Sequence, residues 1–163
     1  MKFLFKIGVL FLVLTSSQIA HAQIKLVKIK ATGLTCSMCS NAIYKQLKTI
    51  ANVEKIETDL DSNTFTVTLK NQNDATPLIF KEKVEKAGFF IGSLVITSNF
   101  DTLSKNPYVL LDKSANTSNL LQAKVLNKGF LTDKEFKKTA KLSTDNTGFL
   151  KNNDTQFLIK ILN

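Results

Sequence analysis

The sequence VEKIETDLDSNTFTVTL, residues 53–69, contains two strand patterns on either side of a short turn. Residues 53–60 predict one strand, and in residues 65–69 apolar side chains alternate with threonines, as in a half-buried strand. Residues 61–63, Asp-Ser-Asn, are typical turn residues. Because the connection is so short, the two strands must pair as an antiparallel hairpin.

The patterns on either side of this hairpin complete a small α+β domain. Residues 24–31 alternate as a strand does, and residues 39–50 repeat apolar side chains at helical spacing. Residues 77–87 predict a second amphipathic helix, and residues 89–95 predict a fourth strand. The order β-α-β-β-α-β is that of the ferredoxin-like sandwich, in which both helices lie on one face of a four-stranded antiparallel sheet.

Two cysteines lie in the loop between the first strand and the first helix. The loop sequence is GLTCSMC, residues 33–39, and Cys36 and Cys39 are the only cysteines in the chain. Two cysteines at this spacing can direct their sulfurs at one ion, and a helix N-terminus favours the negative thiolate. A thiolate is both a good metal ligand and a good nucleophile. These residues therefore leave metal binding and redox chemistry both open.

The first 22 residues predict a secretory signal peptide. Lysines precede an apolar run at residues 7–14, and Ala20-His21-Ala22 has the small-x-small form of a cleavage site. The apolar run is too short for a membrane span, which needs about 20 residues. We therefore expect an exported protein, periplasmic or extracellular, with no membrane span after cleavage.

Cleavage at this point also restricts the metal chemistry, because it removes His21, the only histidine. A structural zinc site takes four ligands, usually cysteine and histidine, so zinc is the less favoured ion. Copper(I) fits two soft sulfurs best, with silver(I) and mercury(II) as alternatives. Haem attachment would require histidine after Cys39, where Ser40 stands. A structural disulfide is the simplest rival, but one that spans two residues would add little stability.

The charge of the chain is strongly positive and comes from lysine alone. The formal net charge is +9, and removal of the two lysines in residues 1–22 lowers it to +7. Nucleic-acid readers depend on arginine for base edges, and this chain has none. We therefore expect no nucleic-acid partner, and interpret the charge as a solvated surface or as a patch for an acidic protein.

The cysteine loop within this pattern of elements resembles the heavy-metal-associated domain family. That family includes copper chaperones, amino-terminal domains of copper-transporting ATPases, and the periplasmic mercury-binding protein. Its G-M-T-C-x-x-C motif, in which Leu34 replaces the usual methionine, is matched by Gly33, Thr35, Cys36 and Cys39. Phe89 after Gly88 matches a glycine-aromatic pair of the family, whereas Asn52 stands where the family often has glycine.

The resemblance implies that Cys36 and Cys39 are the metal ligands, with Leu34, Met38 and Phe89 near the site as packing or edge residues. It also implies a non-enzymatic copper(I) carrier or scavenger. Its partner would be a metal-transporting membrane protein or another carrier. The alternatives are a mercury(II)-binding protein of the same fold and a thiol–disulfide oxidoreductase. A thioredoxin-like oxidoreductase would place a helix where residues 53–69 predict a hairpin.

The last third of the chain shows no comparable motif. We place the signal peptide at residues 1–22, the heavy-metal-associated domain at 23–96, a polar linker at 97–106, and a small β-rich C-terminal domain of unknown role at 107–163. Within the C-terminal domain, strands are predicted at residues 108–111, 120–126 and 157–162. Thr132 and Glu135 have the spacing of a capping box that opens a short helical turn.

Overall fold

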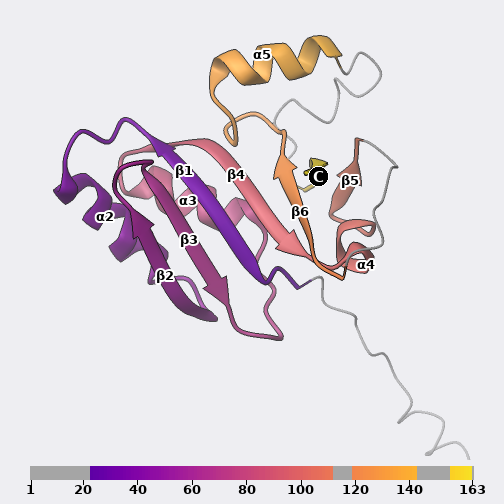
Figure 1. The fold of residues 1–163 in the computed structure, drawn as a ribbon, viewed down its shortest axis with the longest axis horizontal. Helices are drawn as coiled ribbons and strands as arrows, with labels where there is room; N and C mark the ends of the chain where they lie inside the picture. The colour runs from indigo at the N-terminus through magenta and orange to yellow at the C-terminus, as the bar shows by residue number, and fades with distance from the viewer. Residues whose placement is uncertain (1–22, 112–118, 143–154, 163) are drawn as a thin grey trace, which may run out of the picture.

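The computed structural model describes residues 23–111, 119–142 and 155–162, which form one seven-stranded sheet in the order β2-β3-β1-β4-β6-β7-β5 (Figure 1). The strands are β1 (Leu26–Thr32), β2 (Val53–Asp59), β3 (Thr64–Leu69), β4 (Phe90–Ser98), β5 (Tyr108–Leu110), β6 (Leu121–Val125) and β7 (Phe157–Leu162). The helices are α2 (Ser37–Leu47), α3 (Pro77–Lys86), α4 (Phe100–Leu103) and α5 (Asp133–Leu142). The predicted signal peptide lies outside the described residues. No helix within them is long and apolar enough to cross a membrane.

The first six elements confirm the predicted ferredoxin-like fold. Strand β1 pairs antiparallel with both β3 and β4, and β2 pairs antiparallel with β3 as the predicted hairpin. Alternate residues of β1, Val27 and Ile29, are fully buried beneath the two helices. From the helices, Ile43 of α2 and Phe80 of α3 enter the same buried cluster. This apolar layer fixes the start of α2, and with it the cysteine loop, over one end of the sheet.

The C-terminal strands extend this sheet. Strand β6 pairs antiparallel with β4, and β7 lies between β6 and β5, antiparallel to the first and parallel to the second. All three strands form close to where the sequence predicts them. The segment predicted as a linker, residues 97–106, contains the last two residues of β4 and the short helix α4. The division into two domains stays a prediction.

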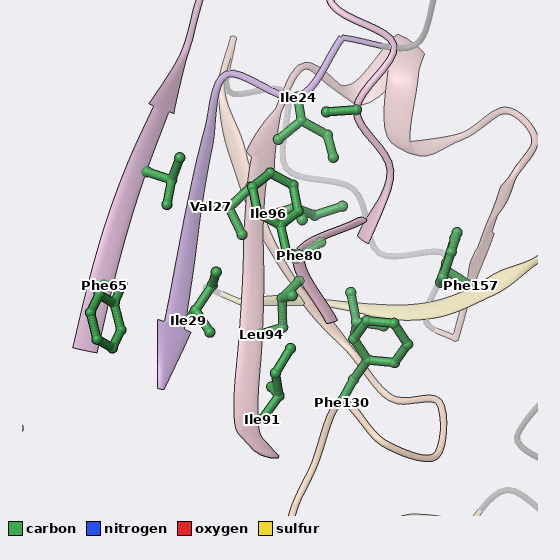
Figure 2. Packing of buried hydrophobic residues seen from close by; sticks show 14 of the residues in the cluster. Ile24, Val27, Ile29, Phe65, Phe80, Ile91, Leu94, Ile96, Phe130 and Phe157 are labelled. Carbon is green, nitrogen blue, oxygen red and sulfur yellow. The ribbon is translucent and has the colours of Figure 1, made fainter. Parts of the chain in front are cut away.

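One buried cluster crosses the boundary between the two parts. It joins residues of β1, β3 and β4 to residues of β6, β7 and the loop that carries Phe130 (Figure 2). The rings of Phe130 and Phe157 meet edge to face, with centroids 5.8 Å apart, and Tyr108 lies 6.1 Å from Phe157. Aromatic pairs at these separations add to the apolar burial. The C-terminal strands therefore share a core with the N-terminal part.

Helix α5 lies on the opposite face of the sheet from α2 and α3. Along β7, Phe157 and Ile159 belong to the main cluster, whereas Leu158 between them belongs to a second cluster, which Phe136 of α5 packs against. One half of the predicted capping box forms, because the Glu135 amide donates to Thr132 Oγ1 at 3.3 Å, while the Glu135 carboxylate accepts from the Thr132 hydroxyl at 3.5 Å. The helix continues to Leu142, well beyond the short turn that the sequence predicts.

The directions of the strands place two features at one end of the sheet. Strands β1 and β6 are both antiparallel to β4, so they run in the same direction and end at the same side. The cysteine loop follows β1, and helix α5 follows β6. In Figure 1 both segments therefore leave the sheet at the same end, although α2 and α5 themselves lie well apart.

Candidate metal centre

The loop before α2 turns sharply at Gly33. Its φ of 86° lies in the left-handed region, which glycine adopts without strain. A Cβ at Gly33 would be 3.9 Å from the ring of Phe89, so this aromatic side chain lies directly beside the loop. Leu34 and Phe89 are both half-buried and pack against the main core cluster. Both side chains therefore lie where the cysteine loop meets the core, and their role at a metal site stays a prediction.

The two cysteines occupy the N-terminus of α2. Cys36 is the residue that caps the helix, with extended backbone angles, and Cys39 lies in the first turn. The Cys39 amide donates a hydrogen bond to the Cys36 carbonyl at 3.1 Å. This turn brings the two thiol sulfurs to 2.8 Å from each other. Both are free thiols. Cys36 is exposed and Cys39 is partly exposed.

Hydrogen bonds at the helix start favour the thiolate form of Cys39. The Cys36 thiol and, next, a backbone hydrogen bond from Thr35 hold the pKa of the Cys39 thiol below its ordinary value. Desolvation acts in the opposite direction but does not reverse the shift. A lowered thiol pKa makes a better ligand available near neutral pH, because the thiolate is the form that binds metals.

The surroundings of Cys36 include two residues that the sequence alone did not indicate. A shallow depression beside the Cys36 sulfur is bounded on its far side by Leu60 and Asn63 of the β2–β3 turn. The Ala31 amide donates to the Asn63 carbonyl at 3.0 Å, which holds this turn against the end of β1. In a ferredoxin-like fold the β2–β3 turn and the β1–α2 loop lie at one end, and this rule could have identified both residues.

The side chain of Met38 is turned toward solvent. Its side chain is 81% exposed, although it lies between the two cysteines in the sequence. Within the described ranges, no group of three or more His, Cys, Asp or Glu residues could surround an ion. The donor set that the described residues present at this helix start is therefore a pair of thiols.

Comparison with known proteins agrees with this geometry. The sequence model of the heavy-metal-associated domain family matches residues 28–90, a range that includes both cysteines, Gly33 and Phe89. The chain belongs to the heavy-metal-associated domain family. The predicted family is thus confirmed, and residues 97–163 lie outside the match. Metal binding is the chemistry of this domain, and the loop between β1 and α2 is where its cysteine pair stands.

Three solved structures are similar to this heavy-metal-associated domain. They are the yeast copper transporter domain Ccc2a, a copper binding domain from the P-type ATPase HMA7, and the N-terminal domain of a potential copper-translocating P-type ATPase from Bacillus subtilis. Their sequence identities are 35%, 30% and 28%, each with a TM-score of 0.37. The matches cover 40%, 40% and 41% of this chain and 88%, 88% and 82% of those chains. No curated protein matches the chain.

Proposed function

We propose that this protein is an exported, non-enzymatic carrier or scavenger of copper(I), which it holds between Cys36 and Cys39. The observation that carries the proposal is the pair of free thiols 2.8 Å apart at an open helix N-terminus in a heavy-metal-associated domain. Two soft sulfurs match the preference of copper(I). The signal-peptide pattern of residues 1–22 supports export.

Loading requires the two sulfurs to separate. A near-linear dithiolate places them roughly 4 to 4.5 Å apart, about twice a metal–sulfur bond of ~2.3 Å. Cys36 can make this adjustment, because it is exposed and precedes the regular helix. Cys39 is held within the first turn and supplies the fixed ligand. Binding releases the thiol protons, so affinity for copper(I) increases with pH until both thiols are ionised.

The open side of the site allows the bound ion to be transferred to another protein. A two-coordinate ion accepts a third sulfur, so an incoming thiolate can bond to the metal before one of the original sulfurs leaves. The depression between Cys36 and the β2–β3 turn provides room for this approach. The receiving protein in this proposal is a metal-transporting membrane protein or a second carrier. Similar domains in copper P-type ATPases support a transporter as partner.

The main competing function is thiol–disulfide exchange. The lowered pKa of the Cys39 thiol suits that chemistry as well as it suits metal binding. What favours the carrier is the fold around the cysteines, because the hairpin of β2 and β3 stands where a thioredoxin-like enzyme has a helix. Mercury(II) remains the alternative cargo, since it also accepts two thiolates.

The decisive experiment is an anaerobic titration of the reduced protein with copper(I) against a chromophoric chelator. We expect one equivalent to bind tightly to the wild type and to be lost in the Cys36→Ser, Cys39→Ser double variant. Met38→Leu is the matched control, because it changes the exposed sulfur between the cysteines and should bind as the wild type does. Equal, weak competition by wild type and double variant would sink the proposal.

Two further assays identify the preferred metal and test for the competing oxidoreductase activity. Competition with silver(I), mercury(II) and zinc should leave zinc as the weakest binder, since two thiols satisfy only half of its usual shell. The same protein is then tested for insulin reduction. Insulin reduction by the wild type that is lost in the double variant, combined with poor copper(I) binding, would indicate an oxidoreductase.

A further inference from the structure

Helix α5 carries a uniformly cationic face that the proposed metal chemistry does not use. Its sequence is DKEFKKTAKL, and its lysines recur at i, i+3, i+4 and i+7, which places them on one side of the helix. All four side chains are exposed. We call this surface the lysine face; it consists of Lys134, Lys137, Lys138 and Lys141.

The lysine face has no acidic partner among the described residues. Ion pairs there involve Lys55, Lys81, Lys105 and Lys124, and none of the four lysines of the face. The two acids of α5 stand in its first turn, where Glu135 pairs with Lys124 at 3.0 Å. Like charges at these helical spacings repel one another and destabilise a helix. A binding partner with negative charge would relieve that repulsion.

The opposite side of α5 is already occupied. Phe136 and Ala140 pack on the second cluster, whose buried members are Leu126, Leu131 and Leu158. These two apolar side chains are therefore engaged with the sheet, and the side turned away from it carries the lysines. Any partner of the lysine face must be held by charge at its surface.

Helix α5, which carries the lysine face, begins close to the end of β1. Thr32, the last residue of β1, and Thr132, which precedes α5, both approach Gly92. A Cβ built there would lie 2.6 Å from Thr32 Cγ2 and 3.6 Å from Thr132 Cγ2. The start of α5 and the start of the cysteine loop are therefore neighbours (Figure 1). The lysine face itself points away from the sheet, on the side of the sheet opposite α2.

We infer that the lysine face binds the anionic surface of a lipid bilayer. The chemistry of the face favours lipid headgroups over an acidic protein. Protein interfaces are built around buried aromatic, methionine and arginine side chains, and this face presents lysine alone. A row of mobile ammonium groups suits the diffuse negative charge of a bilayer, where clusters of four or more lysines bind.

The test uses the chain from Gln23 onward, which keeps every described residue and removes the apolar N-terminal run. The apo protein is sedimented with vesicles of phosphatidylcholine, or of phosphatidylcholine mixed with phosphatidylglycerol. We expect binding to the anionic vesicles alone, and its loss at about 1 M salt, where the Debye length is about 3 Å. Because no metal is present, this result is independent of the proposed carrier function.

Two glutamine variants distinguish the effect of the lysine face on vesicle binding from the effect of net charge. Replacing its four lysines by glutamine, a good helix former, should reduce binding by at least about tenfold while circular dichroism shows the fold unchanged. A matched variant with the same net charge replaces four exposed lysines elsewhere, namely Lys25, Lys45, Lys48 and Lys70. It should bind within about twofold of the original protein.

Three outcomes would overturn the inference. The first is no binding of the original protein to anionic vesicles at low salt. The second is an equal loss in both glutamine variants, which would indicate net charge without a specific face. The third is retention on an immobilised acidic peptide with no binding to vesicles, which would assign the face to an acidic protein partner.

Discussion

Asn52 connects α2 to β2 with a backbone conformation that few residues adopt readily. Its φ is 62°, in the left-handed region, and its carbonyl accepts a hydrogen bond from the Lys70 amide at 2.8 Å. Asparagine tolerates this region better than other residues with a side chain. The glycine common at this position in the family would do the same. Asn52 therefore differs from the glycine of the family but still adopts the left-handed backbone conformation that this position requires.

We expect Asn52→Ala to lower the free energy of unfolding by about 1 kcal/mol, because alanine gains strain in the left-handed region. Asn52→Gly should stay within about 0.5 kcal/mol of the original protein. Urea unfolding followed by circular dichroism measures both. Asn71→Ala, at an exposed position without a left-handed backbone, is the control and should have little effect. Equal losses in the two alanine variants would contradict this account.

The residues of the candidate metal centre show which parts of a site can be proposed from a sequence. Cys36 and Cys39 could be proposed as ligands, because their spacing and their place before a helix are local properties. Leu34 and Phe89 came from the family resemblance, and the structure places both beside the loop. Leu60, at the far side of the depression, depends on how a hairpin distant in sequence meets the loop. No local pattern contains that information, and only the arrangement of the whole ferredoxin-like fold, with both segments at one end of the sheet, could have indicated it.

Secondary-structure elements were predictable wherever a local signal marked them. The hairpin of β2 and β3 and the strands β5, β6 and β7 all lie close to their predicted residues. Helix α5 was predicted at its start, because a capping box is a local motif, but not over its full length. Its apolar positions, Phe136, Ala140 and Leu142, are too few to stand out among the lysines. Only the packing against the second cluster explains why the helix continues.

The threonines that precede α5 and α3 differ in a way that can be measured. Thr132 Oγ1 accepts a hydrogen bond from the Glu135 amide, whereas Thr76 precedes α3 without a side-chain cap bond. Thr132→Ala should therefore destabilise α5 by about 1 kcal/mol, and Thr76→Ala should cost less at α3. Hydrogen exchange of the backbone amides in α3 and α5 measures the loss of stability in each helix separately. Similar losses of protection would show that the Thr132 bond contributes nothing of its own.

At the scale of the whole molecule, the order of strands was beyond sequence reasoning. Each C-terminal strand has a clear local pattern, but nothing in it states that β6 pairs with β4 or that β7 lies between β6 and β5. Pairing over such distances is decided by the faces that must be buried together. Here Ala123 of β6 and Ile159 of β7 join the cluster that holds Val27. The predicted linker and the continuous core therefore lead to opposite expectations for unfolding.

The two tyrosines of the chain can decide between these expectations. Tyr44 belongs to α2 and Tyr108 to β5, so Tyr108→Phe leaves a reporter in the heavy-metal-associated domain and Tyr44→Phe leaves one among the C-terminal strands. Because the sheet and main cluster are shared, we expect tyrosine fluorescence to give one coincident urea transition in both variants. Adding Phe157→Ala should lower both midpoints together, through a loss of about 3–5 kcal/mol. Separate midpoints, with Phe157→Ala moving only the Tyr108 transition, would instead establish two independent domains. The C-terminal strands would then be an attached unit, without a structural role in holding the metal loop.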